Sequence, residues 1–165
     1  MHGIGSFSGA LSRRLVDSLY VEVLVLADEA RSYFDEHGDR DRESLEPMER
    51  VGFSCESLKV TTRLMHVIAW LLTQRAVHRG ELSAADLADH RHRLGDPVES
   101  DMDLVARLPF AAARLVEASQ EFHERISRLE KRMLGEVDDA YATSDAAAAA
   151  LGPARALMHR LESAF

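Results

Sequence analysis

The spacing of apolar residues limits the fold of this chain more than any other feature, because it follows steps of three and four residues. Between residues 108 and 133 the steps alternate between four and three, along the positions Leu108, Ala112, Leu115, Ser119, Phe122, Ile126, Leu129 and Met133. A repeat of 3.5 residues is typical of helices that pack side by side at about 20°. We find no alternation of apolar and polar residues strong enough to predict a strand. The sequence therefore predicts an all-α fold.

Three long helices account for most of the chain. The first is predicted over 8–36, with an apolar face formed by Leu15, Leu19, Val23, Leu26, Ala30 and Tyr33. The second is predicted over 47–79, because it begins with a proline and Gly80 can end it. The third is predicted over 109–135, which ends on a glycine. We predict that the three helices form an antiparallel bundle.

The segment between the second and third helices carries local signals of its own. Ser83 followed by Asp86 is typical of a helix start with an acidic first turn, so we predict a short helix over 84–93. The Gly-Asp-Pro sequence at residues 95–97 predicts a turn after it.

Length and composition favour one bundle domain followed by a tail. The 165 residues come close to a single domain of about 100–150 residues. Hydrophobic residues make up 46% and charged residues 29%, as in folded proteins. We predict a three-helix bundle domain over 1–135 and a flexible C-terminal tail over 136–165, with the spacing of a short amphipathic helix at 154–165.

The net charge and the number of cysteines indicate which partners the protein can bind and in which compartment it resides. A net charge of −8 argues against binding nucleic acid by charge neutralisation. Cys55 is the one cysteine, so an intrachain disulfide is excluded and a reducing compartment is favoured. The most apolar run, residues 65–72, is far shorter than the roughly 20 residues that span a bilayer. With no signal-peptide pattern at the start, we expect a cytoplasmic protein without membrane or nucleic-acid partners.

The residues that usually carry catalysis or metal binding do not occur at useful spacings. In the acidic loop 35–46, Arg40 stands where a calcium-binding loop requires glycine. His90 and His92 are two residues apart and so fall on different helix faces. The sequence at 52–56, Gly-Phe-Ser-Cys-Glu, lacks the second glycine of a nucleophile elbow. We predict no catalytic, cofactor-binding or metal-binding residues, and therefore no enzyme activity.

The second predicted helix is the most informative one for binding. Its apolar arc of roughly 200° is wider than one bundle seam requires, so this helix either contacts both neighbours or also buries a dimer contact. The opposite arc carries polar and basic residues around one tryptophan: Lys59, Arg63, His66, Trp70 and Gln74. Tryptophan beside arginine is typical of interface hot spots, so we predict that this arc binds a protein partner. The alternative is that Trp70 packs beneath a loop or the short helix.

These segments also carry a resemblance to a known family. The sequences EARSYF at 29–34, ESLKVTTRLM at 56–65, AWLLTQRAV at 69–77 and GE at 80–81 resemble the alphaproteobacterial family of the regulator of CtrA degradation (RcdA). The resemblance covers about residues 15–134. It implies a dimeric three-helix bundle that acts as a non-enzymatic adaptor and has no catalytic residues. Such an adaptor helps to deliver regulatory proteins to the ClpXP protease in cell-cycle control, through other adaptors and response regulators.

The 29–34 segment, with Glu29 and Arg31, is the next candidate for partner contact after the Trp70 arc.

Two other functions remain open beside the adaptor function. A helical transcription-associated regulator would require a basic recognition helix, and a small-molecule sensor would require a large apolar cavity between helices.

Overall fold

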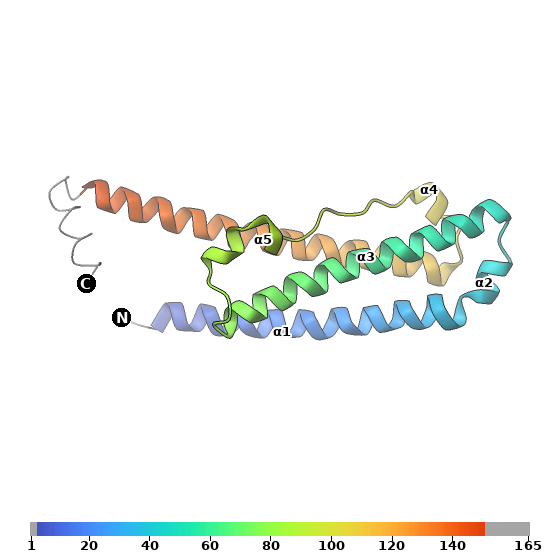
Figure 1. The fold of residues 1–165 in the computed structure, drawn as a ribbon, viewed down its shortest axis with the longest axis horizontal. Helices are drawn as coiled ribbons and strands as arrows, with labels where there is room; N and C mark the ends of the chain where they lie inside the picture. Colours follow the sequence, from blue (N-terminus) through green and yellow to red (C-terminus); the bar gives the residue numbers. More distant parts are fainter. Residues whose placement is uncertain (1–2, 151–165) are drawn as a thin grey trace. The chain divides into compact units, whose positions relative to one another are not determined.

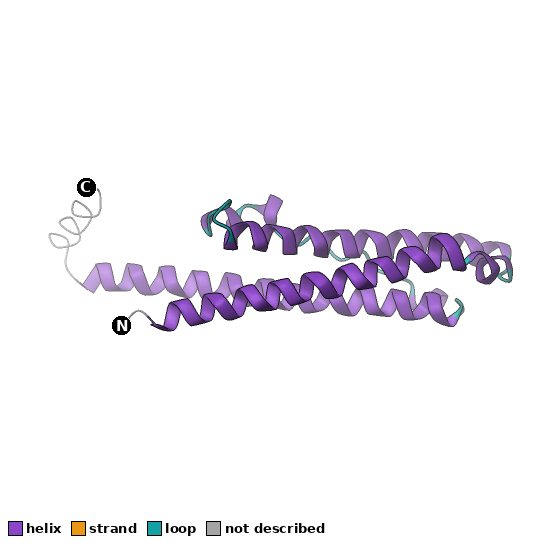
Figure 2. Cartoon of the chain, turned by 90° about the horizontal axis from the view of Figure 1, so that it is seen from below, coloured by secondary structure: helices purple, strands orange, loops and turns teal. Residues whose placement is uncertain are grey.

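The structure is a computed structural model, and it describes the backbone of residues 3–150 and the side chains of residues 12–135 and 142. Its elements are the α-helices α1 (Gly3–Ser32), α2 (Asp39–Glu43), α3 (Pro47–His78), α4 (Met102–Val105) and α5 (Phe110–Ala150), the π-helical turn η1 (Tyr33–His37), and the 3-10 turns η2 (Ala85–Ala88) and η3 (His90–His92). Every element over residues 3–150 is helical, and Figure 2 shows only helices and loops there. The predicted all-α class is confirmed.

Helices α1 and α3 and the part of α5 up to Ser127 pack together in the first of two compact units, residues 1–127 and 128–165. In Figure 1, α1 and α3 lie side by side and run in opposite directions. Helix α5, however, runs in the same direction as α3, since Phe53 packs with Ala112 and Arg63 contacts Ser119. The three-helix bundle is confirmed, while the antiparallel arrangement holds for α1 with each of the others but not for α3 with α5.

The parallel direction follows from the long connection between α3 and α5. Residues 93–101, named the return segment below, have no regular secondary structure and carry the chain back toward the end of the bundle at which α3 begins (Figure 1). Extended chain covers about 3.3 Å per residue, against 1.5 Å in a helix, so a few residues retrace several turns of α3. The predicted short helical element between the second and third long helices is confirmed, with two 3-10 turns inside the predicted range 84–93, whereas residues 95–97 do not form the predicted turn.

Helix α3 begins and ends where the sequence predicts, within one residue. Pro47 occupies the first turn, and the Glu49 side chain accepts a hydrogen bond from the Glu46 N–H at 3.3 Å. At the other end Gly80 has a φ of 76°, and Glu81 N–H donates to the Ala76 carbonyl at 2.9 Å. This left-handed glycine and six-to-one bond form a Schellman motif, which satisfies carbonyls that the helix end leaves open.

The core confirms most of the predicted apolar positions. It contains Val16, Leu19, Val23, Ala30, Phe53, Val60, Leu64, Val67, Trp70, Leu71, Val105, Leu108, Ala112, Val116, Phe122 and Ile126. On α1 the predicted Leu15 is 45% exposed and its neighbour Val16 is buried instead. Leu15 precedes Leu19 by four residues and Val16 precedes it by three. Both steps fit one helix face, so periodicity alone does not show which of the two residues is buried.

The first helix begins at Gly3 rather than at residue 8, and two predicted helix ends also differ from the structure. The first helix ends in η1 and α2 rather than in a plain charged loop, because Tyr33 and Phe34 pack against Phe53 and the Tyr33 hydroxyl donates to Asp41 at 2.6 Å. Gly135 does not end the third helix, which continues to Ala150. One glycine costs only about 1 kcal/mol in a helix interior, and an alanine run follows it. The division at 135/136 stays a prediction, and the terminal helix at 154–165 lies outside the described residues.

Candidate protein-interaction surface

The predicted basic-aromatic arc of α3 is largely inside the bundle. Arg63 is 1% exposed, and Trp70 and Gln74 are each 3% exposed. The expectation that this arc is an open surface is therefore wrong, and for Trp70 the alternative of burial is correct. Periodicity placed these residues away from the apolar arc, yet the return segment and α5 pack over that side of the helix.

Arg63 shows how the arc is covered. Its Nε donates to the Val98 carbonyl at 2.9 Å, and another guanidinium nitrogen donates to Ser119 Oγ at 2.8 Å. A third bond goes to Ser100 Oγ. Burial lowers the pKa of Arg63, and the nearby Glu56 carboxylate partly opposes that shift. The guanidinium thus ties the return segment and α5 to α3.

Glu56 completes this buried polar cluster. The carboxylate is fully buried, accepts a hydrogen bond from Lys59 Nζ at 2.9 Å, and accepts another from the Ser100 hydroxyl. Its Oε2 lies 4.0 Å from the Arg63 guanidinium. Removing one member of a buried pair leaves the other charge unpaired, at about 3–5 kcal/mol. These side chains therefore have a structural role in holding the return segment.

The histidines of the same region hold the first residues of the return segment. His123 Nε2 donates to the Gly95 carbonyl at 3.0 Å. A Cβ at Gly95 would lie 2.6 Å from His66 Nδ1, so the imidazole packs directly on the glycine backbone. Burial lowers the pKa of His123 most, with further lowering by His66 and Arg63, while the bond to Gly95 raises it. The neutral imidazole is therefore favoured at this contact.

The remaining predicted partner residues are accessible. Lys59 has a side chain 29% exposed, and Glu29 and Arg31 lie on the surface of α1. Arg31 is held by Asp28 at 3.2 Å and Glu36 at 3.4 Å. Whether any of the predicted residues contacts a partner stays a prediction.

The structure reveals a different surface, on the side of α3 that faces away from the core. The exposed residues between positions 51 and 74 are Val51, Ser54, Cys55, Leu58, Thr61, Thr62, Met65, Ala69 and Leu72, and none of them is charged. Leu58 is 69% exposed, and Met65, Val51 and Leu72 are 58%, 57% and 46% exposed. A surface helix normally turns charged residues to solvent, and extended apolar patches mark interaction sites.

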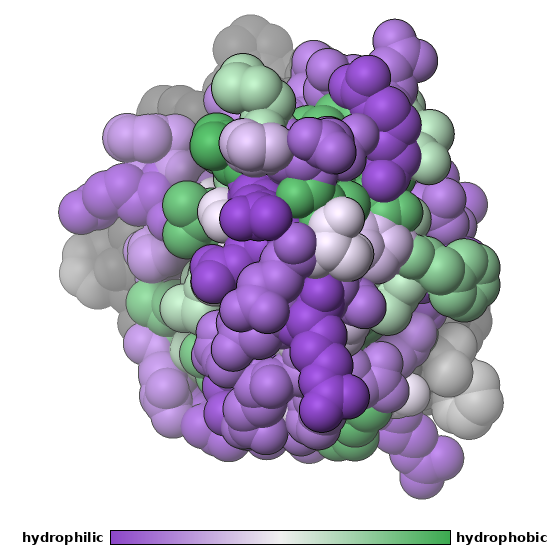
Figure 3. Space-filling view, turned by 90° about the vertical axis from the view of Figure 1, so that its right-hand side faces the viewer, coloured by the Kyte–Doolittle hydropathy of each residue, from purple (hydrophilic) through white to green (hydrophobic). Residues whose placement is uncertain are grey.

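Seven of these residues follow steps of four and three: Val51, Cys55, Leu58, Thr62, Met65, Ala69 and Leu72. We name this row the α3 stripe. Three heptads give it a length of roughly 30 Å. By contrast, Figure 3 shows the end of the bundle near α2 with hydrophobic residues dispersed among hydrophilic ones. The wide apolar arc on this helix was the sequence signal for the stripe, although sequence reasoning did not separate its buried from its exposed residues.

Other kinds of site find no support in the part of the chain that the structure describes. No group of three or more His, Cys, Asp or Glu side chains there could hold a metal ion. Within the same residues, no helix combines the length and hydropathy needed to cross a membrane.

Comparison with known proteins agrees with this fold. The family described as "Protein of unknown function (DUF1465)" matches residues 7–165. The chain belongs to this family. The crystal structure of RcdA from Caulobacter crescentus CB15 is 34% identical, covers 72% of this chain and 91% of that chain, and has a TM-score of 0.58. The predicted resemblance to RcdA is confirmed. A search of curated proteins gave no match.

Proposed function

We propose that this chain is a non-enzymatic, cytoplasmic adaptor of the RcdA type, which helps to deliver regulatory proteins to the ClpXP protease in cell-cycle control. The α3 stripe carries the proposal, because an uncharged apolar row on an exposed helix suits a protein that works through protein contacts. The likeness to RcdA supports the same function.

The occupant that we propose for the α3 stripe is a second copy of this chain. Two symmetry-related copies present the same surface to each other, which suits a self-complementary apolar row. The four-three spacing is that of a coiled-coil seam, with the larger side chains Val51, Leu58, Met65 and Leu72 at one heptad position and smaller ones at the other. Such a dimer would remove four large apolar side chains per copy from water.

The mass in solution tests this dimer. Light scattering at micromolar concentration should give about twice the 18.4 kDa of one chain. The double variant Leu58→Glu, Met65→Glu should give the mass of one chain with unchanged helicity, since charges on the seam oppose association. Val21→Glu is the matched control, because Val21 is an equally exposed apolar residue (61%) on α1. A single-chain mass for the parent at all concentrations, or an unchanged mass for the double variant, would contradict the proposal.

The adaptor function has a separate test. The chain is used to capture proteins from the native cytoplasm, and captured regulators are then offered to purified ClpXP with and without the chain. We expect faster, ATP-dependent loss of at least one regulator when the chain is present, and no loss when the protease is omitted. Capture of DNA or a metabolite alone, or degradation rates that the chain does not change, would contradict the adaptor function even if the dimer is correct.

A further inference from the structure

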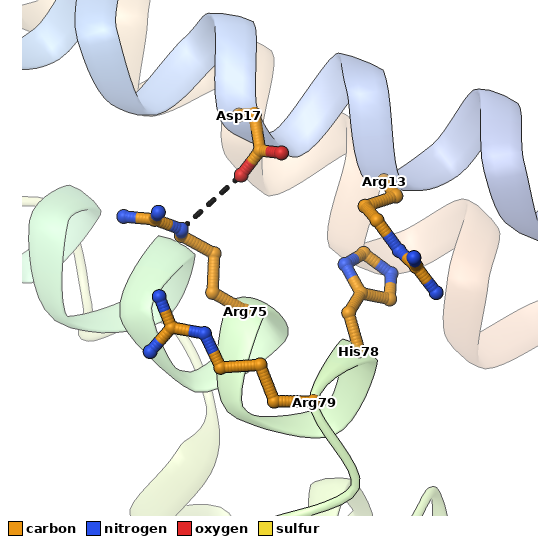
Figure 4. A pocket seen from close by; sticks show the side chains of 5 residues that line it. All are labelled: Arg13, Asp17, Arg75, His78 and Arg79. Atoms are coloured by element: carbon orange, nitrogen blue, oxygen red, sulfur yellow. Dashed lines mark ion pairs between the residues drawn. The ribbon is translucent and has the colours of Figure 1, made fainter.

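A small basic pocket lies between α1 and α3, at the end of α3 that carries the Schellman motif. It has a volume of about 140 Å³ and is lined by Arg13, Asp17, Arg75, His78 and Arg79. Figure 4 shows Asp17 of α1 pointing at Arg75, and Arg13 of α1 beside the His78 ring, while Arg79 follows the last residue of α3. Ligand pockets for drug-sized molecules measure about 300–1,000 Å³, so this one suits a single small group.

Among the described residues, the positive charges of the pocket are not balanced by carboxylates. Arg75 Nε pairs with Asp17 at 3.1 Å and its guanidinium stacks over the Tyr20 ring, so one arginine is neutralised and fixed. Arg79 makes an exposed contact with Glu81 at 4.0 Å, which is worth little in water. Among the described residues, no carboxylate lies within 4.0 Å of the Arg13 guanidinium. The guanidinium groups of Arg13 and Arg79 therefore leave about two positive charges uncompensated in the pocket.

His78 adds an unused polar atom to the same pocket. Its Nδ1 is buried and has no hydrogen-bond partner among the described residues. A buried polar atom without a hydrogen bond is unfavourable. Burial and the Arg13 charge lower the pKa of His78, while Asp17 raises it. The free protein thus holds a neutral ring beside two arginines whose charge is unmet.

We propose that this pocket binds one phosphoryl group, either as free phosphate or as a phosphate monoester. Phosphate monoesters carry about −1.5 to −2 charges at neutral pH, which matches two uncompensated arginines, and a carboxylate would leave one of them unmatched. Guanidinium groups are suited to phosphate because they donate two parallel hydrogen bonds. The His78 ring lines the pocket from α3. This site does not depend on the adaptor function or on the dimer.

Binding is measured by calorimetry at constant ionic strength with three probes: inorganic phosphate, a phosphoserine peptide and the same peptide with serine. We expect saturable binding of at least one phosphorylated probe in the millimolar range or tighter, and none of the serine peptide. Inorganic phosphate binding at least as tightly as the phosphopeptide identifies a free anion as the source. Phosphopeptide binding at least tenfold tighter identifies a phosphoryl group on a partner.

Variants assign the binding to this pocket. Arg13→Gln and Arg79→Gln should each weaken binding about tenfold, whereas Arg114→Gln, an equally exposed arginine on α5, should leave it unchanged. All three are surface changes, and circular dichroism checks that they remain folded. In addition, phosphate should raise the pKa of His78 when followed by NMR. Absence of saturation with both phosphorylated probes, or equal losses in Arg114→Gln, would overturn the proposal.

Discussion

Replacing Trp70 by alanine decides between a structural and a surface role for the residue that the sequence singled out. The side chain is 3% exposed, so truncation leaves a cavity in the core of the bundle. Tryptophan-to-alanine changes in cores cost about 3–5 kcal/mol of unfolding free energy. In a chain of 165 residues, 1 kcal/mol corresponds to a melting shift of about 2–4 °C. Trp70→Ala should therefore lower the melting temperature by roughly 6–20 °C.

The matched control is Phe110→Ala. Phe110 is also a large aromatic residue, but it is 81% exposed at the start of α5. Exposed substitutions usually change stability by less than about 0.5 kcal/mol, so this variant should melt within about 2 °C of the parent. Both melts are followed by circular dichroism at one protein concentration, because a dimer melts at a concentration-dependent temperature. If Trp70→Ala melts like Phe110→Ala, the burial argument fails and Trp70 returns as a partner-binding candidate.

Two further predictions concern the contacts that hold the return segment. Gly95→Ala should destabilise the fold by about 1–3 kcal/mol in urea titrations, because the added Cβ would meet the His66 ring at 2.6 Å. Acidification should also destabilise it: the pKa of His123 is lowered in the folded state, so the unfolded chain binds more protons and stability falls as the pH drops below about 6.5. Melting between pH 7.5 and 5.5 checks this, with His123→Gln expected to flatten the profile; equal stability at both pH values would refute it.

Helix positions were predictable from the sequence because their signals are local. The limits of α3 depend on a proline, a glycine and the residues between them, all of which are neighbours in the chain. The burial of Arg63 and Trp70 depends instead on residues far away in sequence. Arg63 bonds to Val98 and Ser119, which lie 35 and 56 residues further on, and no periodicity within α3 contains that information.

The direction of α5 has the same origin. Ser83 and Asp86 predict a helix start, and the capping contacts between these two residues do form. Local signals do not determine where a connection leads, however. The return segment goes back along α3 because Arg63 and His123 bind its backbone, and this places the start of α5 beside the start of α3.

Helix α3 reverses the usual distribution of charge on a surface helix, and this reversal links its structural and functional roles. Between positions 51 and 74 its charged residues are Glu56 and Arg63, which are buried, and Lys59, which is partly exposed and pairs with Glu56. They are paired, and they hold the return segment and α5. The exposed residues of the same stretch carry no charge. Such an arrangement is unfavourable for a helix that stays exposed, and it becomes favourable when a second apolar surface covers the α3 stripe.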